Sequence, residues 1–380
     1  MQLDKLRGKI DHIDQELLRL FEARMETAVQ IAAQKKKEGL PLLDRKYETE
    51  KIAALVDKVS PDLEPYAHIL YDTLFELSRY HQTSKNAPSP LYAEIQEALQ
   101  HTPALFPQSA NVAYQGVAGA YSQFAVDRLF KRAATHPFKT FESVFAAIDS
   151  GFCKYGVLPL ENSTAGSVTK VYTLMQNYDF KIVRSLRLKV NHNLVAQKGV
   201  RLEDIREIFS HEQALAQCAE FLEQLGPEVK ITSYEDTAAA AETVAKSKRH
   251  DIAAICSYSC VELYDLHCLA RDIQDRNNNY TRFICISKNL EIYPGADRSS
   301  IMMVLPHTPG ALYKTLARFY ALGMNLNKLE SRPLPNRDFQ FMFYFDLETP
   351  VYSEALTQVL RELNDLCDEF YYLGSYNEVV

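Results

Sequence analysis

The sequence lacks any run of apolar residues long enough to cross a membrane. No uncharged apolar stretch approaches the roughly 18 residues that a membrane-spanning helix needs. The start of the chain, Met1 to Lys5, also lacks the apolar core of a secretory signal peptide. From these two absences we expect a cytoplasmic location.

Cysteine is scarce, and its spacing predicts no metal site. The 7 cysteines are an odd number and include no CxxC pair, which fits free thiols in a reducing compartment. Cys256, Cys260 and Cys268 gather near His267, but their spacing is not that of paired zinc ligands. We therefore expect no metal and no other cofactor.

An excess of positive charge is missing as well. Lys and Arg number 42 against 49 Asp and Glu, which gives a net charge of −7 and argues against a chain-wide nucleic-acid surface. With 16 Pro and 13 Gly, the composition is neither collagen-like nor of low complexity. The chain has 47% apolar and 24% charged residues over 380 positions, which is typical of a globular protein of two or three domains.

Hydrophobic periodicity changes along the chain. From Leu3 to about Gln82 the apolar spacing is helical throughout. The polar, proline-containing stretch His81–Pro90 is typical of a linker. A short helical piece at Leu91–Leu99 then precedes a second break at His101–Pro107.

Between Asn111 and Ser287, short apolar runs alternate with amphipathic segments. Helical patterns such as Ala214–Leu225 and Thr237–Lys246 fall between the apolar runs. This alternation predicts an α/β domain with a largely parallel sheet. The candidate strands are Asn111–Tyr114, Tyr155–Pro159, Ile182–Val195, Ile205–Phe209, Val229–Thr232, Asp251–Ile255 and Tyr280–Ser287.

A Pro-Gly turn at Pro294-Gly295 opens a last region whose pattern is βαββαβ, the order of ferredoxin-like α+β folds. The predicted elements are strand Ser300–Leu305, helix Pro309–Leu322, strand Leu326–Arg332, strand Phe339–Leu347, helix Ser353–Leu366 and strand Phe370–Gly374. In all we predict a multidomain chain with an all-α domain at residues 1–88, a linker at 89–108, an α/β domain at 109–290 and an α+β domain at 298–380.

One face of the first helix carries a heptad seam that leads to two cations. The seam residues step by 4, 3, 4 and 3 and are Leu6, Ile10, Ile13, Leu17 and Leu20. The same face continues to Arg24 and Lys35, and a buried cation needs an anion. Pairing with the domain's own Asp or Glu, or fraying of the seam near the helix end, would also account for them.

The spacing of other polar residues in this region indicates which of them can share a pocket. Arg7 lies about 25 Å from Arg24 along the helix axis, too far to share one pocket within a chain. In an antiparallel dimer, Arg7 can reach the corresponding pocket of a partner helix. Ser78 and Gln82 lie at i, i+4 on one face of the last helix.

With this spaced polar set, the region from about Leu3 to Gln82 resembles the all-helical chorismate mutases that form the front half of bifunctional P-proteins. In that family the first arginine crosses from the other subunit. The resemblance implies that two arginines hold the carboxylates of chorismate, and that Lys35 and Gln82 act at the ether oxygen where negative charge develops. The implied substrate-binding residues are Arg7, Arg24, Lys35, Asp44, Glu48, Ser78 and Gln82.

The region departs from the family pattern at one position. The family usually has an arginine just before Glu48, and this chain has Tyr47, with Arg45 and Lys46 nearby. The departure would remove one contact to chorismate.

Three motifs mark the α/β region. An apolar strand runs into the loop Glu161–Gly166, which is rich in hydroxyl and amide groups. Such a loop at the carboxyl end of a strand can present N–H and hydroxyl groups to a carboxylate. The other two are the glycine-containing turn Tyr114–Ser122, which a packing turn also explains, and the Asn-rich entry to a strand at Asn278–Phe283.

Together these motifs resemble the prephenate dehydratases, with further matches at Asn191–Leu194 and Ser210–Leu215. The resemblance implies two α/β lobes like those of periplasmic binding proteins, with the active site in the cleft between them. Thr281 is the implied catalytic residue, because departure of the ring hydroxyl of prephenate calls for a hydrogen-bond donor. The implied substrate-binding residues are Glu161, Asn162, Ser163, Thr164, Thr281, Arg282 and Phe283.

Several of these matches have a second interpretation. Arg282 either binds a carboxylate or braces the loop. Ser210 and Gln213 can form a helix capping box without any catalytic role. His192 and His211 are equally compatible with structural histidines.

The last region carries the motif Pro309–Leu312 at its first helix and the motif Glu330–Pro333 at the end of its second strand. A turn glycine and a surface ion pair would also account for them. Together the two motifs resemble the ACT domain of phenylalanine-regulated dehydratases. The resemblance implies an amino-acid pocket at a subunit interface and feedback inhibition by phenylalanine. The implied regulatory residues are Gly310, Ala311, Leu312, Glu330, Ser331, Arg332 and Pro333.

The sequence thus predicts a bifunctional enzyme of L-phenylalanine biosynthesis. It would rearrange chorismate to prephenate as an isomerase, and convert prephenate to phenylpyruvate as a carbon–oxygen lyase. We expect phenylalanine as an allosteric inhibitor, a homodimer or higher homo-oligomer, and neither nucleic acid nor membrane as a partner. Two alternatives remain, namely an amino-acid-binding regulator with a degenerate dehydratase-like domain, and a dehydratase with a weakened mutase.

Overall fold

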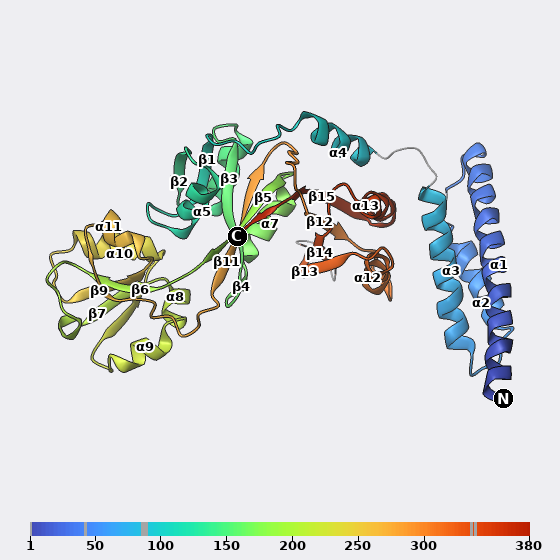
Figure 1. Ribbon diagram of the computed structural model, residues 1–380, viewed down its shortest axis with the longest axis horizontal. Helices are drawn as coiled ribbons and strands as arrows, with labels where there is room; N and C mark the ends of the chain where they lie inside the picture. The colour runs from blue at the N-terminus through green and yellow to red at the C-terminus, as the bar shows by residue number, and fades with distance from the viewer. Residues whose placement is uncertain (1, 42–43, 85–89, 335–336, 338–339) are drawn as a thin grey trace. The chain divides into compact units, whose positions relative to one another are not determined.

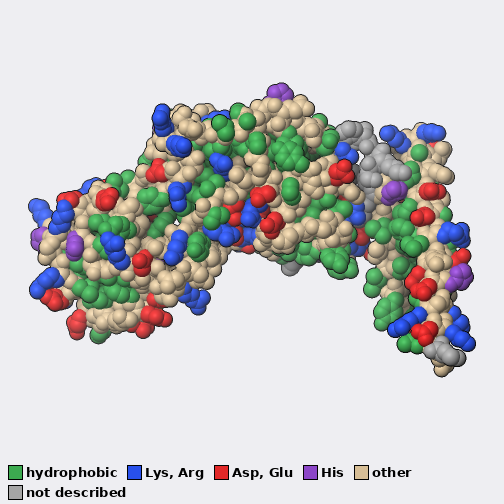
Figure 2. Space-filling model, in the orientation of Figure 1, with side chains coloured by type: hydrophobic (Ala, Val, Ile, Leu, Met, Phe, Trp, Pro, Cys, Tyr) green, Lys and Arg blue, Asp and Glu red, His purple; other side chains and the backbone are tan. Residues whose placement is uncertain are grey.

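The computed structural model describes residues 2–41, 44–84, 90–334, 337 and 340–380 (Figure 1). The chain separates into two compact units, residues 1–93 with 357–366, and residues 94–356 with 367–380. Residues 85–89, in the polar stretch predicted as a linker, and Phe339, where a predicted strand begins, lie outside the described residues. None of the described helices combines the length and apolar character needed to cross a membrane. On the face that Figure 2 shows, charged side chains of both signs are interspersed.

The first unit is built from α1 (Gln2–Lys37), α2 (Arg45–Val56) and α3 (Glu64–Ser84). Helix α3 packs against both α1 and α2. Asp44 caps α2, because its carboxylate accepts a hydrogen bond from the backbone N–H of Tyr47 at 3.0 Å. Met25 and Ala28 are the buried residues of α1.

The described residues leave the heptad seam of α1 uncovered, which corrects the expectation of a buried face. Its five apolar side chains remain 52–57% exposed in the single chain. The helix is 36 residues long, and its buried residues, Met25 and Ala28, both lie in its C-terminal half. Helix α4 (Pro90–His101) follows and contains the helical piece predicted at Leu91–Leu99.

The second unit begins with a seven-stranded sheet in the order β16-β5-β11-β3-β1-β2, with β4 paired to β3. Its strands are β1 (Asn111–Gln115), β2 (Ala134–Phe138), β3 (Tyr155–Asn162), β4 (Gly166–Ser167), β5 (Lys181–Lys189), β11 (Tyr280–Ser287) and β16 (Glu378–Val379). Its helices are α5 (Tyr121–Leu129), α6 (Phe141–Asp149) and α7 (Thr169–Asn177). Apolar side chains of these helices, such as Val144 and Phe145, are buried in the core beside the strands.

A second sheet has the order β10-β6-β9-β7-β8. Its strands are β6 (Asn193–Ala196), β7 (Glu207–Ser210), β8 (Lys230–Ser233), β9 (Ile252–Cys256) and β10 (His267–Ala270). The helices are α8 (Glu212–Ala216), α9 (Ala219–Gln224), α10 (Thr237–Lys246) and α11 (Ser259–Leu263). The two sheets form two lobes, and the chain passes between them near residues 190–192 and 271–279 (Figure 1).

Three predictions for this region were wrong. The single strand Ile182–Val195 is two strands in different lobes, β5 and β6, because the polar Asn191-His192 stretch carries the chain from one lobe to the other. The helix Ala214–Leu225 is broken into α8 and α9. The sheets are mixed rather than largely parallel, since β11 returns from the second lobe and runs antiparallel to both its neighbours.

The last region has the predicted βαββαβ order and an antiparallel sheet in the order β13-β14-β12-β15. Its elements are β12 (Arg298–Val304), α12 (Ala311–Ala321), β13 (Asn325–Pro333), β14 (Phe341–Glu348), α13 (Glu354–Leu366) and β15 (Glu369–Tyr376). Gly310 precedes α12 with φ of 81°, a left-handed conformation that favours glycine. Strand β16 then leaves this region and pairs with β5 of the first lobe.

Candidate active sites

Arg24 is the centre of the polar group in the helical unit. Its Nη1 donates to the carbonyl of Leu74 at 2.8 Å and to the hydroxyl of Ser78. The guanidinium lies 4.9 Å from the ring centre of Phe75. Partial burial lowers the pKa of Arg24, although the carboxylate of Glu48 acts in the opposite direction. The structure thus brings together Arg24 and Ser78, with Glu48 near enough to influence the pKa of Arg24.

Arg79 is a residue of this group that sequence reasoning missed. Its guanidinium pairs with the carboxylate of Glu48, and the two side chains are only 14% and 18% exposed. Tyr47, at the position where the family usually has an arginine, is 56% exposed. The sequence offered one signal for Arg79, namely that it directly follows Ser78. Glu48 is therefore paired with a cation from α3, and the exposed Tyr47 does not supply that cation.

The other predicted mutase residues are distributed along the helices. Gln82 donates from Nε2 to the carbonyl of Ala28 at 2.7 Å, which places it against α1. Lys35 is half-buried near the end of α1, and Asp44 is the exposed cap of α2. Arg7 is exposed and lies 4.0 Å from Asp4, remote from Arg24 on the same helix.

The two α/β lobes enclose a cavity of about 540 Å³. The first lobe contributes Asn162, Phe283 and Thr281, and the second lobe contributes His211 and Gln213. The loop that follows β3 forms part of the wall, from Ala165 to Lys170. This arrangement places the predicted strand-end motifs around one space.

Asn162 is fixed by hydrogen bonds on both sides of its amide. Its Nδ2 donates to Thr281 Oγ1 at 2.9 Å and to Asn279 Oδ1 at 2.7 Å. Its Oδ1 accepts from the hydroxyl of Thr164 at 2.7 Å and from two backbone N–H groups of the loop. Because Thr281 Oγ1 accepts from Asn162, the proton of Thr281 can be donated to a group in the cavity.

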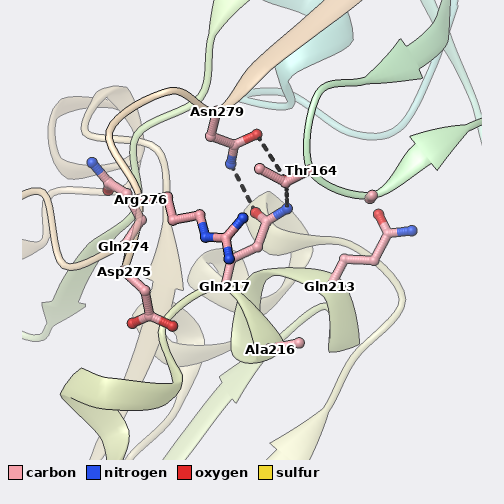
Figure 3. A pocket seen from close by; sticks show the side chains of 9 residues that line it. Thr164, Gln213, Ala216, Gln217, Gln274, Asp275, Arg276 and Asn279 are labelled. Atoms are coloured by element: carbon pink, nitrogen blue, oxygen red, sulfur yellow. Dashed lines mark hydrogen bonds between the residues drawn. The ribbon is translucent and has the colours of Figure 1, made fainter.

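Gln217, at the end of α8, is a second residue that sequence reasoning missed. Its Nε2 donates to Thr164 Oγ1 at 2.7 Å, and its Oε1 accepts from Asn279 Nδ2 at 2.8 Å (Figure 3). The same oxygen lies 2.8 Å from Nε2 of His192. Gln217 also lines a neighbouring cavity of about 430 Å³, shown in Figure 3. One amide thus joins the second lobe to the loop of the first.

The two histidines have different surroundings. His192 is 3% exposed, and burial lowers its pKa. Since the carbonyl oxygen of Gln217 can only accept, the ring carries its proton on Nε2. His211 caps α8, where its Nδ1 accepts from the N–H of Gln213 at 3.2 Å. The predicted Ser210–Gln213 capping box was wrong, because Ser210 instead donates to the carbonyl of Ile255.

Ser163, Glu161 and Arg282 are placed outside the group that faces the cavity. Ser163 joins the β3 loop to the start of β11, donating to the carbonyl of Asn278 at 2.7 Å. Arg282 is buried, with an ion pair to Asp346 and a hydrogen bond to the hydroxyl of Tyr376 at 3.0 Å. Burial tends to raise the pKa of Glu161, but Lys328 and then Arg282 outweigh it and lower that pKa below its ordinary value.

The tail has a cavity of about 350 Å³ beside Gly310, Ala311 and Leu312. Phe341 and Phe343 form an apolar part of its lining. The second predicted motif lies elsewhere, with Glu330 accepting a hydrogen bond from Ser167 and pairing with Arg332 at 2.6 Å. The single chain therefore does not bring the two predicted regulatory motifs together.

No group of three or more His, Cys, Asp or Glu side chains suited to a metal ion occurs in the part of the chain that the structure describes. Cys256 and Cys260 are buried free thiols, as are Cys153, Cys218 and Cys285.

Comparison with known families identifies the two domains that contain these sites. The prephenate dehydratase family model matches residues 112–291, and that of chorismate mutase type II matches residues 6–83. The helical unit and the two-lobed cleft thus define a chorismate mutase joined to a prephenate dehydratase.

A relative that combines the same two domains identifies the family of this chain more specifically. A bifunctional chorismate mutase/prephenate dehydratase of Aquifex aeolicus is 32% identical over 99% of this chain and 98% of its own length. The chain belongs to the bifunctional chorismate mutase/prephenate dehydratases, and it is an enzyme of phenylalanine biosynthesis with both activities. The predicted family and function are thereby confirmed.

Two further relatives each match more than two thirds of the chain. The arogenate dehydratase/prephenate dehydratase 2 of Arabidopsis thaliana is 35% identical over 79% of this chain and 80% of its own length. The crystal structure of a prephenate dehydratase of Arthrobacter aurescens in complex with L-Phe is 28% identical, with a TM-score of 0.65, and covers 70% of this chain and 89% of that one.

Proposed function

We propose that Arg24, Glu48, Ser78 and Gln82 form the chorismate site of the helical unit, with Lys35 at the ether oxygen. The rearrangement breaks a C–O bond and forms a C–C bond within one molecule, so it needs no base and no covalent intermediate. The site has to hold the dicarboxylate compact and to place cations where negative charge develops. The cation of Arg24, partly buried beside Ser78, supports this assignment.

The exposed seam of α1 supports a homodimer. Five apolar side chains more than half exposed on one helical face form the kind of surface that a second copy covers. In such a dimer Arg7, which is remote from Arg24 in its own chain, reaches the partner's site. Replacing Ile13 by Glu should dissociate the dimer in sedimentation and reduce mutase activity. A monomer with full mutase activity would contradict the shared site.

Thr281 is the proposed catalytic residue of the dehydratase. The ring carboxylate of prephenate leaves as CO2, and its bonding electrons enter the ring as the C–O bond to the hydroxyl breaks. The departing hydroxide takes a proton and leaves as water, and the product is aromatic phenylpyruvate. The hydrogen bond from Asn162 to Thr281 Oγ1 carries the proposal, because it directs the threonine proton toward the cavity.

The remaining dehydratase assignments follow the walls of the cavity. Asn162 and Phe283 line the cavity, where Phe283 supplies an apolar surface for the ring. Thr164 lines the neighbouring cavity and orients Asn162 by a hydrogen bond. Glu161, Ser163 and Arg282 contribute by holding the strand ends rather than by touching prephenate. We propose the domain limits 1–88, 109–290 and 298–380, with the linker at 89–108, and a cytoplasmic location that the free thiols support.

The tail is proposed to be an ACT domain that senses phenylalanine. The Arthrobacter aurescens relative was crystallised with L-Phe. In this chain the cavity at Gly310–Leu312 has an aromatic lining that suits an apolar amino-acid side chain. Glu330, Ser331, Arg332 and Pro333 would complete the pocket or transmit its occupancy.

One assay tests these proposals together. The enzyme is supplied with chorismate alone, with and without phenylalanine, and prephenate and phenylpyruvate are followed in parallel. Both products are expected, and phenylalanine should lower phenylpyruvate formation and raise the thermal unfolding midpoint. No effect of millimolar phenylalanine on either quantity would contradict the sensor.

A further inference from the structure

Strand β13 of the tail directs charged side chains inward. Its burial alternates strictly, so that Lys328, Glu330 and Arg332 are half-buried while the residues between them are exposed. The side chain of Lys328 is only 12% exposed. A strand face that packs against another part of a protein is usually apolar, and a buried ammonium needs an anion and further acceptors. The partners of Lys328 therefore indicate the role of this half-buried face of β13.

The two shortest polar contacts of Lys328 go to the two sides of one hairpin in the dehydratase lobe, and Glu330 of its own strand lies 3.9 Å away. Glu161 of β3 and Ser167 of β4 lie opposite each other in the β3–β4 pair. Lys328 Nζ forms an ion pair with the carboxylate of Glu161 and donates to Ser167 Oγ at 2.8 Å. Ser167 Oγ in turn donates to Glu330 Oε2 at 2.9 Å. One lysine of the tail thus holds both ends of the loop between β3 and β4.

That loop forms a wall of the dehydratase cavity. In the β3–β11 ladder, Asn162 lies opposite Thr281, and Glu161 lies opposite Arg282. Successive residues of a strand point to opposite faces of the sheet. Asn162 therefore faces the cavity while its neighbour Glu161 faces the tail. A displacement of Glu161 must shift Asn162, whose amide directs the hydroxyl of Thr281.

We propose that Lys328 is a positioning residue of the dehydratase reaction, holding the loop Asn162–Gly166 through Glu161 and Ser167. The inference rests on the proposed role of the cavity as the prephenate site. Lys328 does not line that cavity, so it acts through the hairpin and not through substrate contact. Displacement of a reacting group by about 1 Å can reduce a rate by about 100-fold, which makes the position of this loop matter to turnover. The tail is then a structural part of the dehydratase site.

The test compares Lys328→Met with Lys288→Met in the full-length enzyme. Lys288 is also ion-paired, to Asp149 at 3.0 Å, but its side chain is 58% exposed and lies away from the hairpin. We expect Lys328→Met to lower kcat for prephenate by about tenfold or more and to change KM by less than about threefold. Lys288→Met should leave both constants unchanged, and Lys328→Arg should restore part of kcat. Mutase activity serves as the internal control for each variant.

A double variant separates positioning from simple destabilisation. If Lys328 acts through the hairpin, the enzyme with both Glu161→Gln and Lys328→Met should be no slower than the slower single variant. The proposal would be overturned if Lys328→Met had the same kcat as Lys288→Met, or if it raised KM and left kcat unchanged. It would also be overturned if the losses of kcat in the two single variants added fully in the double variant. Thermal unfolding is recorded for every variant. Should Lys328→Met not fold, Ser167→Ala takes its place, and an unchanged kcat there would equally refute it.

The failure of the proposed function has a different signature. Absence of phenylpyruvate from the unaltered enzyme would contradict the dehydratase assignment itself. Phenylpyruvate from the unaltered enzyme, combined with a normal kcat in Lys328→Met and Ser167→Ala, would contradict the role of Lys328 alone.

Discussion

Asn162 donates a hydrogen bond from Nδ2 to Oγ1 of Thr281 at 2.9 Å, across the ladder that joins β3 and β11. This contact uses a lone pair of the threonine oxygen and leaves its proton free to be donated. A hydroxyl is a weak acid, so the direction of that proton matters more than its pKa. The pair therefore defines where the leaving hydroxyl of prephenate should lie.

Thr281→Ala is expected to lower dehydratase turnover by about 10²- to 10⁴-fold, the range for loss of a positioned proton donor. Mutase activity should persist, because the helical unit is a separate compact body of the chain. Phenylpyruvate and prephenate are measured in one assay. Thr281→Ser keeps the hydroxyl and should retain much more activity than Thr281→Ala. Near-normal phenylpyruvate formation by Thr281→Ala would refute the assignment.

Gln217→Met is expected to lower dehydratase kcat about tenfold. The substitution keeps the length of the side chain but removes the hydrogen bonds to Thr164 and Asn279, and a buried partner left unsatisfied is costly. Gln224→Met, at the exposed end of α9, is the matched control. Equal kcat values in the two variants would show that the bridge between the lobes has no part in turnover.

Some residues of the candidate dehydratase site could be predicted from the sequence, and others could not. Asn162 could be predicted because it ends an apolar strand, where functional side chains gather in α/β folds. Thr281, the second residue of β11, was predicted only through the family resemblance of its motif. Gln217 lies at the break between two short helices that the sequence suggested as one. Lys328 comes from a strand more than 160 positions further along the chain, and its ion pair follows from tertiary packing that no local pattern encodes.

The same limit applies to the strands. The β11 prediction was correct because its apolar run is bounded by polar residues on both sides. The β5–β6 break was missed because apolar runs flank the short polar stretch at Asn191-His192. β2 was missed because it contains His136 and Pro137 at the edge of a sheet, a place where proline is tolerated.

Arg79→Met is expected to lower mutase activity about tenfold and to leave the dehydratase unchanged. Its guanidinium is the cation that meets Glu48, and loss of one partner leaves a mostly buried carboxylate without its charge-assisted bond. Arg19→Met, an exposed arginine near Glu16 on α1, controls for the substitution itself. If the two variants show the same rate of prephenate formation, Arg79 has no role in the chorismate site.

Tyr47→Arg tests the same region from the opposite direction. The substitution introduces the arginine that the family usually has before Glu48. Because Arg79 already pairs with Glu48, we expect KM for chorismate to fall by less than about threefold. A tenfold or larger fall would show that the mutase of this chain is weakened by Tyr47.

His192 predicts how the stability of the dehydratase lobes depends on pH. Burial lowers its pKa in the folded state below the value of 6.5 that the exposed ring has. Between those two values the unfolded chain binds more protons than the folded one, so stability rises with pH in that window. The contribution is fully present above pH 6.5 and is lost as the pH falls through the folded-state pKa.

Thermal unfolding of the unaltered enzyme and of His192→Gln is compared from pH 7.5 to 5, with the exposed His250→Gln as the control. The unaltered enzyme and His250→Gln should lose stability in parallel on acidification, whereas His192→Gln should lose less. Parallel curves for all three proteins would mean that His192 titrates alike in the folded and unfolded states.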